Sequence, residues 1–173
     1  MIRYSACAIL AVALVGCGSG ATQLTDLKEQ GGVTMQSGNP FTSDAVLYHA
    51  NGQLKEQRHF VDGLLEGTWG KWYEDGQKEY EGAWQKGKRQ GKEISWYPNG
   101  QEKSQTEWNM DVPTGVHVTW YENGQMETKK PYVDGKPYGV WQFWSDAGVK
   151  EKHEVYEDGE LVETIAAQTA PAE

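Results

Sequence analysis

Apolar and polar side chains alternate along short stretches of the chain. In one stretch, Val116, Val118 and Trp120 alternate with His117 and Thr119. Successive side chains of a β-strand point to opposite faces, so this alternation predicts a strand with one mainly apolar face.

The second face of the predicted sheet is mixed. It carries Glu93 and Ser95 in one stretch, but Trp69 and Tyr73 in another and Trp141 and Phe143 in a third. The pattern therefore predicts strands with apolar side chains on both faces, and it does not indicate which face is exposed.

A glycine recurs at a fixed period of 24 residues, after Asn or Asp in four cases and after Ala147 in the last. These glycines are Gly52, Gly76, Gly100, Gly124 and Gly148. Two aromatic columns keep the same register. They are Tyr48, Trp72, Trp96, Trp120 and Trp144, and then Phe60, Trp84, Trp108, Tyr132 and Tyr156. Several columns in phase indicate a fold built from one repeated unit.

The Asn-Gly and Asp-Gly pairs lie between runs rich in Tyr, Trp, Val and Thr, and they predict β-hairpins. A two-residue type I′ turn needs positive φ at both positions, which these residues supply. We expect such turns at residues 51–52, 75–76, 99–100 and 123–124. Further glycines predict shorter reversals within residues 61–67, 85–91 and 133–139.

Each repeat thus contains two strands and two turns. The predicted fold is all-β: an antiparallel meander of about ten short strands, built from five 24-residue hairpin repeats in one extended or curled sheet. At about 4.8 Å per strand, this sheet would extend about 45 Å. No helix of useful length fits between the turns.

The ten aromatic residues of the two columns would expose more than about 1,000 Å² of apolar surface on a flat, bare sheet. Either the sheet curls over them or a partner covers them. We expect them mainly to form a continuous core, because one repeat cannot bury its own aromatic residue whereas stacked repeats can. Alternatively, the tryptophan row could stack on sugar rings of a glycan or hold an extended peptide.

The repeated unit reads aromatic-Tyr-x-Asn-Gly-Gln, then Lys-Glu, then an aromatic residue and two spaced glycines. It resembles the bacterial variant of the MORN repeat, and the array is similar to the YwqK-type family, which is often described as antitoxin-like. The resemblance covers residues 41–163 and implies a β-hairpin scaffold used for interaction and not for catalysis. The chain departs from the pattern at Asp111, Pro113, Ser145 and Ala147.

Residues 1–16 are typical of a secretory signal peptide. Arg3 precedes a mostly apolar stretch, residues 6–15, which is too short to span a bilayer as a helix. The expected consequence is export, with the first 16 residues removed.

The segment that ends in Cys17 resembles the bacterial lipobox, Leu-Val-Gly-Cys. This resemblance implies cleavage before Cys17 and a lipid, with fatty acyl chains such as palmitate, on that cysteine. Gly18, in place of the aspartate associated with inner-membrane retention, implies the outer membrane, facing the periplasm. An ordinary signal peptide cut nearby is the alternative.

Cysteine usage and net charge reduce the kinds of site and partner that the protein could have. Cys7 lies in the segment to be removed and Cys17 would be acylated, which leaves no thiol for a disulfide, a metal site or a nucleophile. Cleavage also removes one Arg and no acidic residue, so the formal net charge changes from -9 to -10. Charge and the expected export disfavour nucleic acid as a partner, because phosphate binding needs a basic surface. Anionic lipid headgroups, a role proposed for some MORN repeats, are disfavoured for the same reason.

The ends of the chain lack strand patterns. Residues 18–40 mix Gly, Ser, Gln and Thr without apolar periodicity, so the segment 17–40 is interpreted as the lipidated cysteine and a flexible tether. Residues 164–173 are expected to be a disordered tail. The repeat domain is then residues 41–163.

Catalytic and cofactor motifs are not found in the sequence. His49, His59, His117 and His153 fall at unrelated columns of the repeat and make no recognised metal-ligand pair. The glycine-rich segments lack the Lys-Ser/Thr ending of a phosphate loop. We therefore expect no enzyme activity, no metal and no cofactor.

Two functions remain as hypotheses. The first is a lipid-anchored envelope scaffold, attached to the membrane through Cys17, that binds a protein or peptidoglycan. The second, by family analogy, is an antitoxin or immunity-like protein that neutralises a toxin. Export argues against a cytosolic toxin, but an immunity protein against an incoming envelope-active toxin would be compatible with it.

Overall fold

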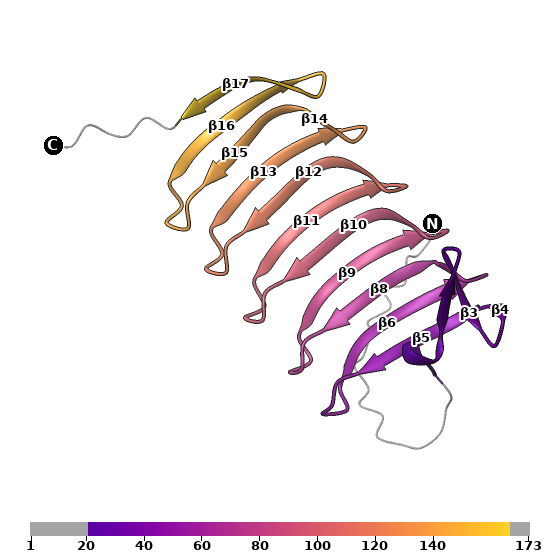
Figure 1. Cartoon of the computed structure of the whole chain (residues 1–173). Coiled ribbons are helices and arrows are strands. Elements are labelled where there is room, and N and C mark those ends of the chain that lie inside the picture. Colours follow the sequence, from indigo (N-terminus) through magenta and orange to yellow (C-terminus); the bar gives the residue numbers. More distant parts are fainter. Residues whose placement is uncertain (1–20, 167–173) are drawn as a thin grey trace, which may run out of the picture.

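The computed structural model describes residues 21–166, most of which form one large, open β-sheet (Figure 1). Eleven antiparallel strands follow one another across it in chain order. They are β5 (Ser43–Tyr48), β6 (Leu54–Val61), β8 (Gly67–Trp72), β9 (Lys78–Gln85), β10 (Lys88–Trp96), β11 (Glu102–Asn109), β12 (Val112–Trp120), β13 (Met126–Val133), β15 (Gly139–Trp144), β16 (Lys150–Glu157) and β17 (Glu160–Ala166). The predicted meander of hairpin repeats is confirmed.

Short elements complete the sheet at its margins. β7 (Leu64–Leu65) extends the pairing of β6, and β14 (Lys136–Pro137) extends that of β13. β1 (Thr22–Gln23) pairs in parallel with β5 at one edge, and β17 forms the other edge. Within residues 21–166, no helix has the length and apolar character needed to cross a membrane. The predicted signal peptide, Cys17 and Gly18 lie outside the described residues.

The hairpin loops at the Asn-Gly and Asp-Gly pairs differ from the predicted type I′ turns. In the first loop the amide of Gly52 donates to the carbonyl of His49, and only the glycine has positive φ, at 85°. This is a three-residue loop that ends in a glycine bulge. The preceding Asn51 instead uses its side chain, whose Oδ1 accepts the amide of Gln53. The prediction of type I′ turns at the Asn-Gly pairs is therefore wrong.

Positive φ at two successive residues occurs instead in the shorter turns that lie between the Asn-Gly loops. Asp62 and Gly63 have φ of 50° and 75°, and Met110 and Asp111 have φ of 51° and 71°. Asp111 occupies the column of glycines that includes Gly63, and Asp is one of the few side chains that tolerate this conformation. Its carboxylate accepts the amide and the Nε of Arg89, so this departure from the repeat pattern leaves the turn intact.

The constant spacing of the Asn-Gly-Gln motif within the chain follows from contacts between successive repeats. Asn51 donates through Nδ2 to the carbonyl of Glu74 in the next repeat. The side chain of Gln53 lies against Gly76, where an added Cβ would be 2.9 Å from its Oε1. Position 76 thus needs a glycine for two reasons: its backbone has positive φ, and Gln53 of the preceding repeat fills the space that a side chain would occupy.

A second ladder of side-chain hydrogen bonds joins the repeats. The hydroxyls of Tyr73 and Tyr97 donate to the carbonyls of Trp96 and Trp120, at 2.6 and 2.9 Å, and Tyr121 repeats the contact one unit later. Each such bond contributes about 1 kcal/mol. The repeats are therefore tied at their turns as well as through the strand pairing.

The two faces of the sheet are defined by its registers, because directly opposite residues point to the same face. One row runs through Arg58, Trp69, Gly82, Glu93, Thr106, His117, Lys130, Trp141 and Glu154. A parallel row runs through Glu56, Lys71, Tyr80, Ser95, Ser104, Thr119, Thr128, Phe143 and Lys152. We call the surface that carries both rows the Trp69 face.

The two aromatic columns lie on opposite faces. The second column, from Phe60 to Tyr156, lies two residues along each strand from members of the first row and therefore belongs to the Trp69 face. Trp72 lies over Gly70, whose added Cβ would be 2.4 Å from the indole ring, so the first column points to the opposite surface, here called the Trp72 face.

Most of these aromatic residues are not a buried core. Of the ten, only Phe60 is buried, with 3% exposure, Tyr48 is 46% exposed and the other eight are partly buried. The expectation of a continuous core is wrong because, among residues 21–166, the large sheet does not close on itself and only its first repeat, around Phe60, is covered by other residues.

The prediction of a flexible tether up to residue 40 is also wrong from residue 21 onward. η1 (Leu24–Asp26), a 3₁₀ turn, is followed by a small antiparallel sheet of β2 (Lys28–Gln30), β3 (Val33–Gln36) and β4 (Asn39–Pro40). The amide of Thr34 donates to the carbonyl of Gly63, at 2.8 Å, and Gly63 donates to Phe41, at 2.7 Å. Residues 21–41 thus cap the first repeat.

The cap encloses the small hydrophobic core. Phe41, Ala45 and Phe60 are buried together, with Leu24, Leu27 and Leu65 packed against them. The rings of Phe41 and Phe60 meet edge to face, with centroids 5.8 Å apart. A repeat array needs a terminal unit that covers the apolar side chains of its outermost repeat, and the cap does so at this end.

The opposite end of the array extends further than predicted. β17 continues to Ala166 and pairs with β16, so the disordered tail expected from residue 164 is wrong for residues 164–166. Residues 167–173 lie outside the described part of the chain. Every residue of β17 is exposed.

Candidate binding surface

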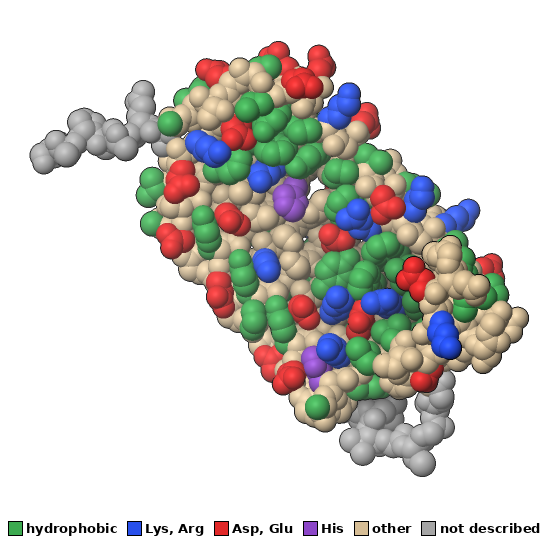
Figure 2. Space-filling model, viewed as in Figure 1, with side chains coloured by type: hydrophobic (Ala, Val, Ile, Leu, Met, Phe, Trp, Pro, Cys, Tyr) green, Lys and Arg blue, Asp and Glu red, His purple; other side chains and the backbone are tan. Residues whose placement is uncertain are grey.

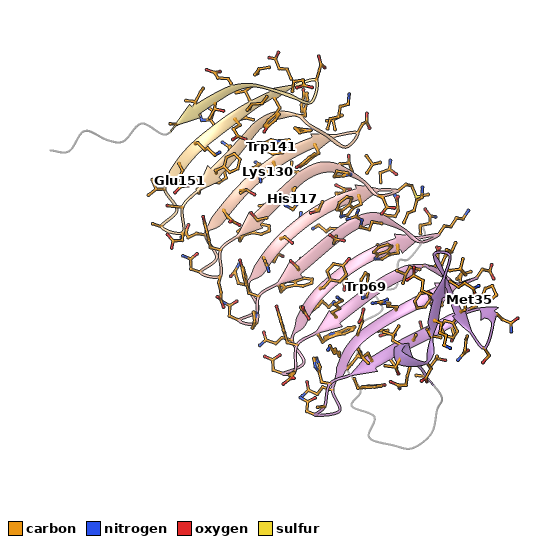
Figure 3. The ribbon with its side chains drawn as sticks, viewed as in Figure 1. Met35, Trp69, His117, Lys130, Trp141 and Glu151 are labelled. Atoms are coloured by element: carbon orange, nitrogen blue, oxygen red, sulfur yellow. The ribbon has the colours of Figure 1, made fainter. Side chains whose placement is uncertain are left out.

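The Trp69 face carries two groups of aromatic side chains, one near each end of the array (Figures 2 and 3). Figure 3 labels Trp69 in one group and Trp141 in the other, with His117 and Lys130 between them. Trp69 and Trp141 occupy the same column of the repeat, three units apart, and Glu93 and His117 fill that column in between.

The first aromatic cluster consists of Trp69, Tyr80 and Trp84. The ring centroid of Trp69 is 5.2 Å from that of Tyr80 and 5.6 Å from that of Trp84. Arg58 and Lys71 lie over the Trp69 ring, at 4.4 and 4.9 Å from its centroid. These cation–π contacts hold the tryptophan in place and place positive charge at its surface.

A wide, open hollow of about 650 Å³ lies over this first cluster. Its lining comprises Trp69, Lys71, Tyr80, Trp84, Gly87, Arg89, Glu93 and Asp111. Two of these side chains are basic and two are acidic, so their formal charges sum to zero. The Tyr80 hydroxyl donates to Glu93 Oε2, at 2.8 Å, and Arg89 Nε lies 3.1 Å from Asp111 Oδ1. The hollow is thus aromatic, polar and close to neutral.

The second aromatic cluster consists of Tyr132, Trp141 and Tyr156. The Trp141 centroid lies 5.2 Å from that of Tyr132 and 4.5 Å from that of Tyr156. The Trp141 Nε1 donates to the carbonyl of Pro131, which fixes the indole. Lys130 Nζ lies 5.2 Å from the Trp141 centroid, so this cluster repeats the aromatic and cationic character of the first.

The Tyr156 hydroxyl adds a carboxylate contact to the second cluster. It donates to Glu154 Oε2, at 3.0 Å, and the other oxygen of Glu154 accepts Lys152 Nζ, at 2.8 Å. The first cluster has the same combination of tyrosine, carboxylate and cation in Tyr80, Glu93 and Lys71. Both ends of the surface therefore offer the same chemistry.

Hydroxyl groups occupy the middle of the surface. Ser95 and Ser104 share a hydrogen bond between their hydroxyls, at 2.7 Å, and Thr119 and Thr128 share one at 2.8 Å. In the neighbouring row, Thr106 and His117 are hydrogen-bonded. Each hydroxyl pair uses one of its two protons internally. Ser95, Ser104 and Thr119 are partly exposed and keep hydrogen-bonding capacity for a ligand, whereas Thr128 is buried.

Two groups of this face have shifted pKa values. Burial, with the hydrogen bond to Glu93, raises the pKa of Tyr80, so this hydroxyl stays protonated as a donor. Burial, with the charge of Lys130, lowers the pKa of His117 below its usual value of 6.5. His117 is therefore neutral at pH 7, and the middle of the surface carries no histidine charge.

Two of the other histidines have local partners at separate places. His49 lies against the backbone carbonyl of Trp72, and His59 contacts Asp44. Among residues 21–166, no group of three or more His, Cys, Asp and Glu side chains lies close enough to hold a metal ion.

The sequence pattern did not identify the clusters as units. It placed Trp69, Trp141 and Phe143 on the mixed face, but it did not bring Tyr80 or Lys130 to them. The sequence did carry one signal, a change of residue type along a single column of the repeat, which contains Trp69, Glu93, His117 and Trp141. Cross-strand pairing, which needs the register, supplies the remaining members.

Fold and surface together define a β-hairpin repeat protein with a displayed, side-chain-rich sheet face. Comparison with protein families finds the MORN repeat variant at residues 44–62, 89–109 and 113–134. The first match lies over β5 and β6, the second over β10 and β11, and the third over β12 and β13, so each covers one hairpin. The chain therefore contains three hairpins similar to the MORN repeat variant, and such repeats suggest a scaffold or binding module. No curated protein matches the chain.

Proposed function

We propose that this protein is a non-catalytic binding scaffold of the bacterial cell envelope, anchored by a lipid on Cys17, whose Trp69 face binds a protein or a cell-wall component. The observation that carries the proposal is the surface itself. The Trp69 face is continuous and carries two aromatic clusters. Among the described residues, the buried hydrophobic side chains lie at the capped end. Partly buried aromatic residues beside charged groups are typical of binding sites.

The folded cap supports an anchor that holds one edge of the sheet close to the membrane. Thr22, where β1 begins at the edge of β5, lies five positions after Cys17. Even fully extended, five residues reach at most about 18 Å. A lipid on Cys17 would therefore hold the β1 edge near the bilayer, with the β17 edge directed away from the anchored end.

The pairing of the carboxylates supports a binding role in place of catalysis. The carboxylates of the Trp69 face already have partners, since Glu93 accepts from Tyr80, Glu56 pairs with Arg58 and Glu154 pairs with Lys152. A general base needs a carboxylate or imidazole that can reach a substrate proton. Paired carboxylates instead orient donors for recognition.

The proposed location follows from the start of the chain and from its charge. The lipobox-like segment before Cys17, with Gly18 after it, favours the outer membrane, facing the periplasm. The acidic balance disfavours nucleic acid and anionic lipid as partners of the sheet. The membrane contact would then run through Cys17 alone, which leaves the Trp69 face for the partner.

Affinity capture from membranes tests this proposal. Replacement of Glu93, His117 and Thr119 by Lys adds positive charge and bulk to the middle of the Trp69 face, and we expect at least a tenfold loss of the captured partner. A matched triple variant, Gln105, Val116 and Gln142 to Lys, changes the Trp72 face and should capture as much as the wild type.

Equal capture by the wild type and both triple variants would contradict a binding role of the Trp69 face. Capture of a toxin whose lethality the protein suppresses would replace the scaffold function by the immunity function. Turnover of a substrate by the purified protein, lost in the first triple variant, would contradict both.

A further inference from the structure

We infer that the Trp69 face binds an extended, neutral oligosaccharide that lies across the strands and contacts both aromatic clusters at once. This inference rests on the proposed function and names the ligand class for the same face. It follows from three properties of the surface: the repetition of one cluster at two places, the hydroxyl groups between them and the balance of charge.

The spacing of the clusters favours a long ligand. Trp69 lies on β8 and Trp141 on β15, with β9, β10, β11, β12 and β13 between them, which makes six steps from strand to strand. At about 4.8 Å per step, the clusters are about 29 Å apart. One compact molecule cannot contact both, whereas a chain that runs perpendicular to the strands can.

The chemistry of each cluster matches a sugar ring. A pyranose ring has flat faces of C–H groups and a rim of hydroxyls. In the first cluster, Arg58 and Lys71 lie over the Trp69 ring, so Trp84 and Tyr80 provide the remaining aromatic wall of the hollow. In the second cluster, Tyr156 takes the repeat position of Trp84. A carboxylate and a cation beside each wall accept from and donate to hydroxyls.

The middle of the surface matches the same ligand. Ser95, Ser104 and Thr119 are partly exposed and present hydroxyls that both donate and accept, as sugar hydroxyls do, while the buried Thr128 orients Thr119. His117 is neutral there, because burial and Lys130 lower its pKa. A surface with paired charges and no net excess in its hollow gives no advantage to a strongly charged chain.

A peptide fits the Trp69 face less well. An extended peptide gains most of its affinity from main-chain hydrogen bonds to an open strand edge. Across the Trp69 face the strands from β6 to β16 are all paired on both sides, so their backbone groups are used within the sheet. A peptide that crossed it would leave many of its own amides and carbonyls without partners, at a cost in affinity.

Binding of two neutral probes that differ only in length tests the inference. The probes are chitobiose and chitohexaose, of which only the second exceeds the distance between the clusters, and the protein is the full chain in detergent. Calorimetry should give an affinity for chitohexaose about 100-fold above that for chitobiose, because the second contact becomes intramolecular.

Variants locate the two contacts. Trp84→Ala and Tyr156→Ala should each reduce the affinity for chitohexaose to that for chitobiose, while Trp84→Phe and Tyr156→Phe keep a ring and most of the affinity. Trp120→Ala, on the Trp72 face, is the matched control for loss of a large aromatic side chain and should bind as the wild type does. Circular dichroism confirms that each variant is folded.

The outcomes separate this inference from the proposed function. Absence of chitohexaose binding at millimolar concentration, with a protein captured through the Trp69 face, overturns the glycan and leaves the scaffold. Equal affinity for the two probes overturns the two-cluster contact. If neither glycan nor captured protein depends on the Trp69 face, the inference and the proposed function both fail.

Discussion

Cys17→Ser is expected to move the protein from the membrane fraction to the soluble fraction of a Gram-negative host, and to abolish its acylation. The expected change is close to complete, because one cysteine would carry the whole attachment. Several acyl chains hold a protein on a bilayer, while an acidic sheet gains nothing from anionic headgroups. Fractionation, with mass spectrometry of the N-terminal peptide, measures both effects.

Cys7→Ser is the matched control, because it changes a cysteine within the segment expected to be removed. It should leave lipidation and membrane association unchanged. If the Cys17→Ser protein still sediments with membranes and the wild type carries no lipid, the protein is not a lipoprotein.

Phe60→Ala should destabilise the protein by about 3 to 5 kcal/mol. Phe60 is 3% exposed and fills the core under the cap, where it meets Phe41 edge to face. Its removal leaves a cavity that residues 21–41 cannot fill without losing their contacts. Urea unfolding in the soluble Cys17→Ser background gives the free energy, and hydrogen exchange should show the cap opening first.

Trp120→Ala separates burial from aromatic character. Trp120 is larger than Phe60 but only partly buried on the Trp72 face, so its loss should cost about 2 kcal/mol. A greater loss for Trp120→Ala than for Phe60→Ala would mean that the tryptophan column, and not the cap, is the main source of stability.

The repeat architecture was predictable because it depends on local chemistry repeated in phase. A glycine every 24 residues, from Gly52 to Gly148, marks reversals that no other residue allows as easily. Strand number and order follow from those reversals together with the shorter turns between them. The type of each turn did not follow, because Asn51 uses its side chain to cap the loop and leaves positive φ to the glycine.

The relation between the two aromatic columns could not be predicted from their spacing. In each hairpin the second strand contains an extra residue, such as Lys103, since Trp96 lies opposite Glu102 while Ser95 lies opposite Ser104. Such a bulge shifts the register by one, and a shift of one residue exchanges the faces. The clusters of Trp69 and Trp141 depend on that register.

The cap was missed because its pattern is not periodic. Residues 21–40 alternate poorly and contain Gly31, Gly32 and Gly38, which indicate flexibility by composition. Their order comes instead from a tertiary contact, in which β3 lies against Gly63 so closely that an added Cβ would be 2.3 Å from Val33. Sequence alone carries no signal for a contact between unlike segments.

Site-specific photocrosslinking in intact cells tests the central claim, that the Trp69 face holds the partner. A photoreactive residue at His117 lies on that face, and one at the adjacent Val118 lies on the Trp72 face of the same strand. We expect a specific adduct, with a protein or with peptidoglycan, from position 117 and none from position 118. Adducts from position 118 alone, or equally from both positions, would contradict the account.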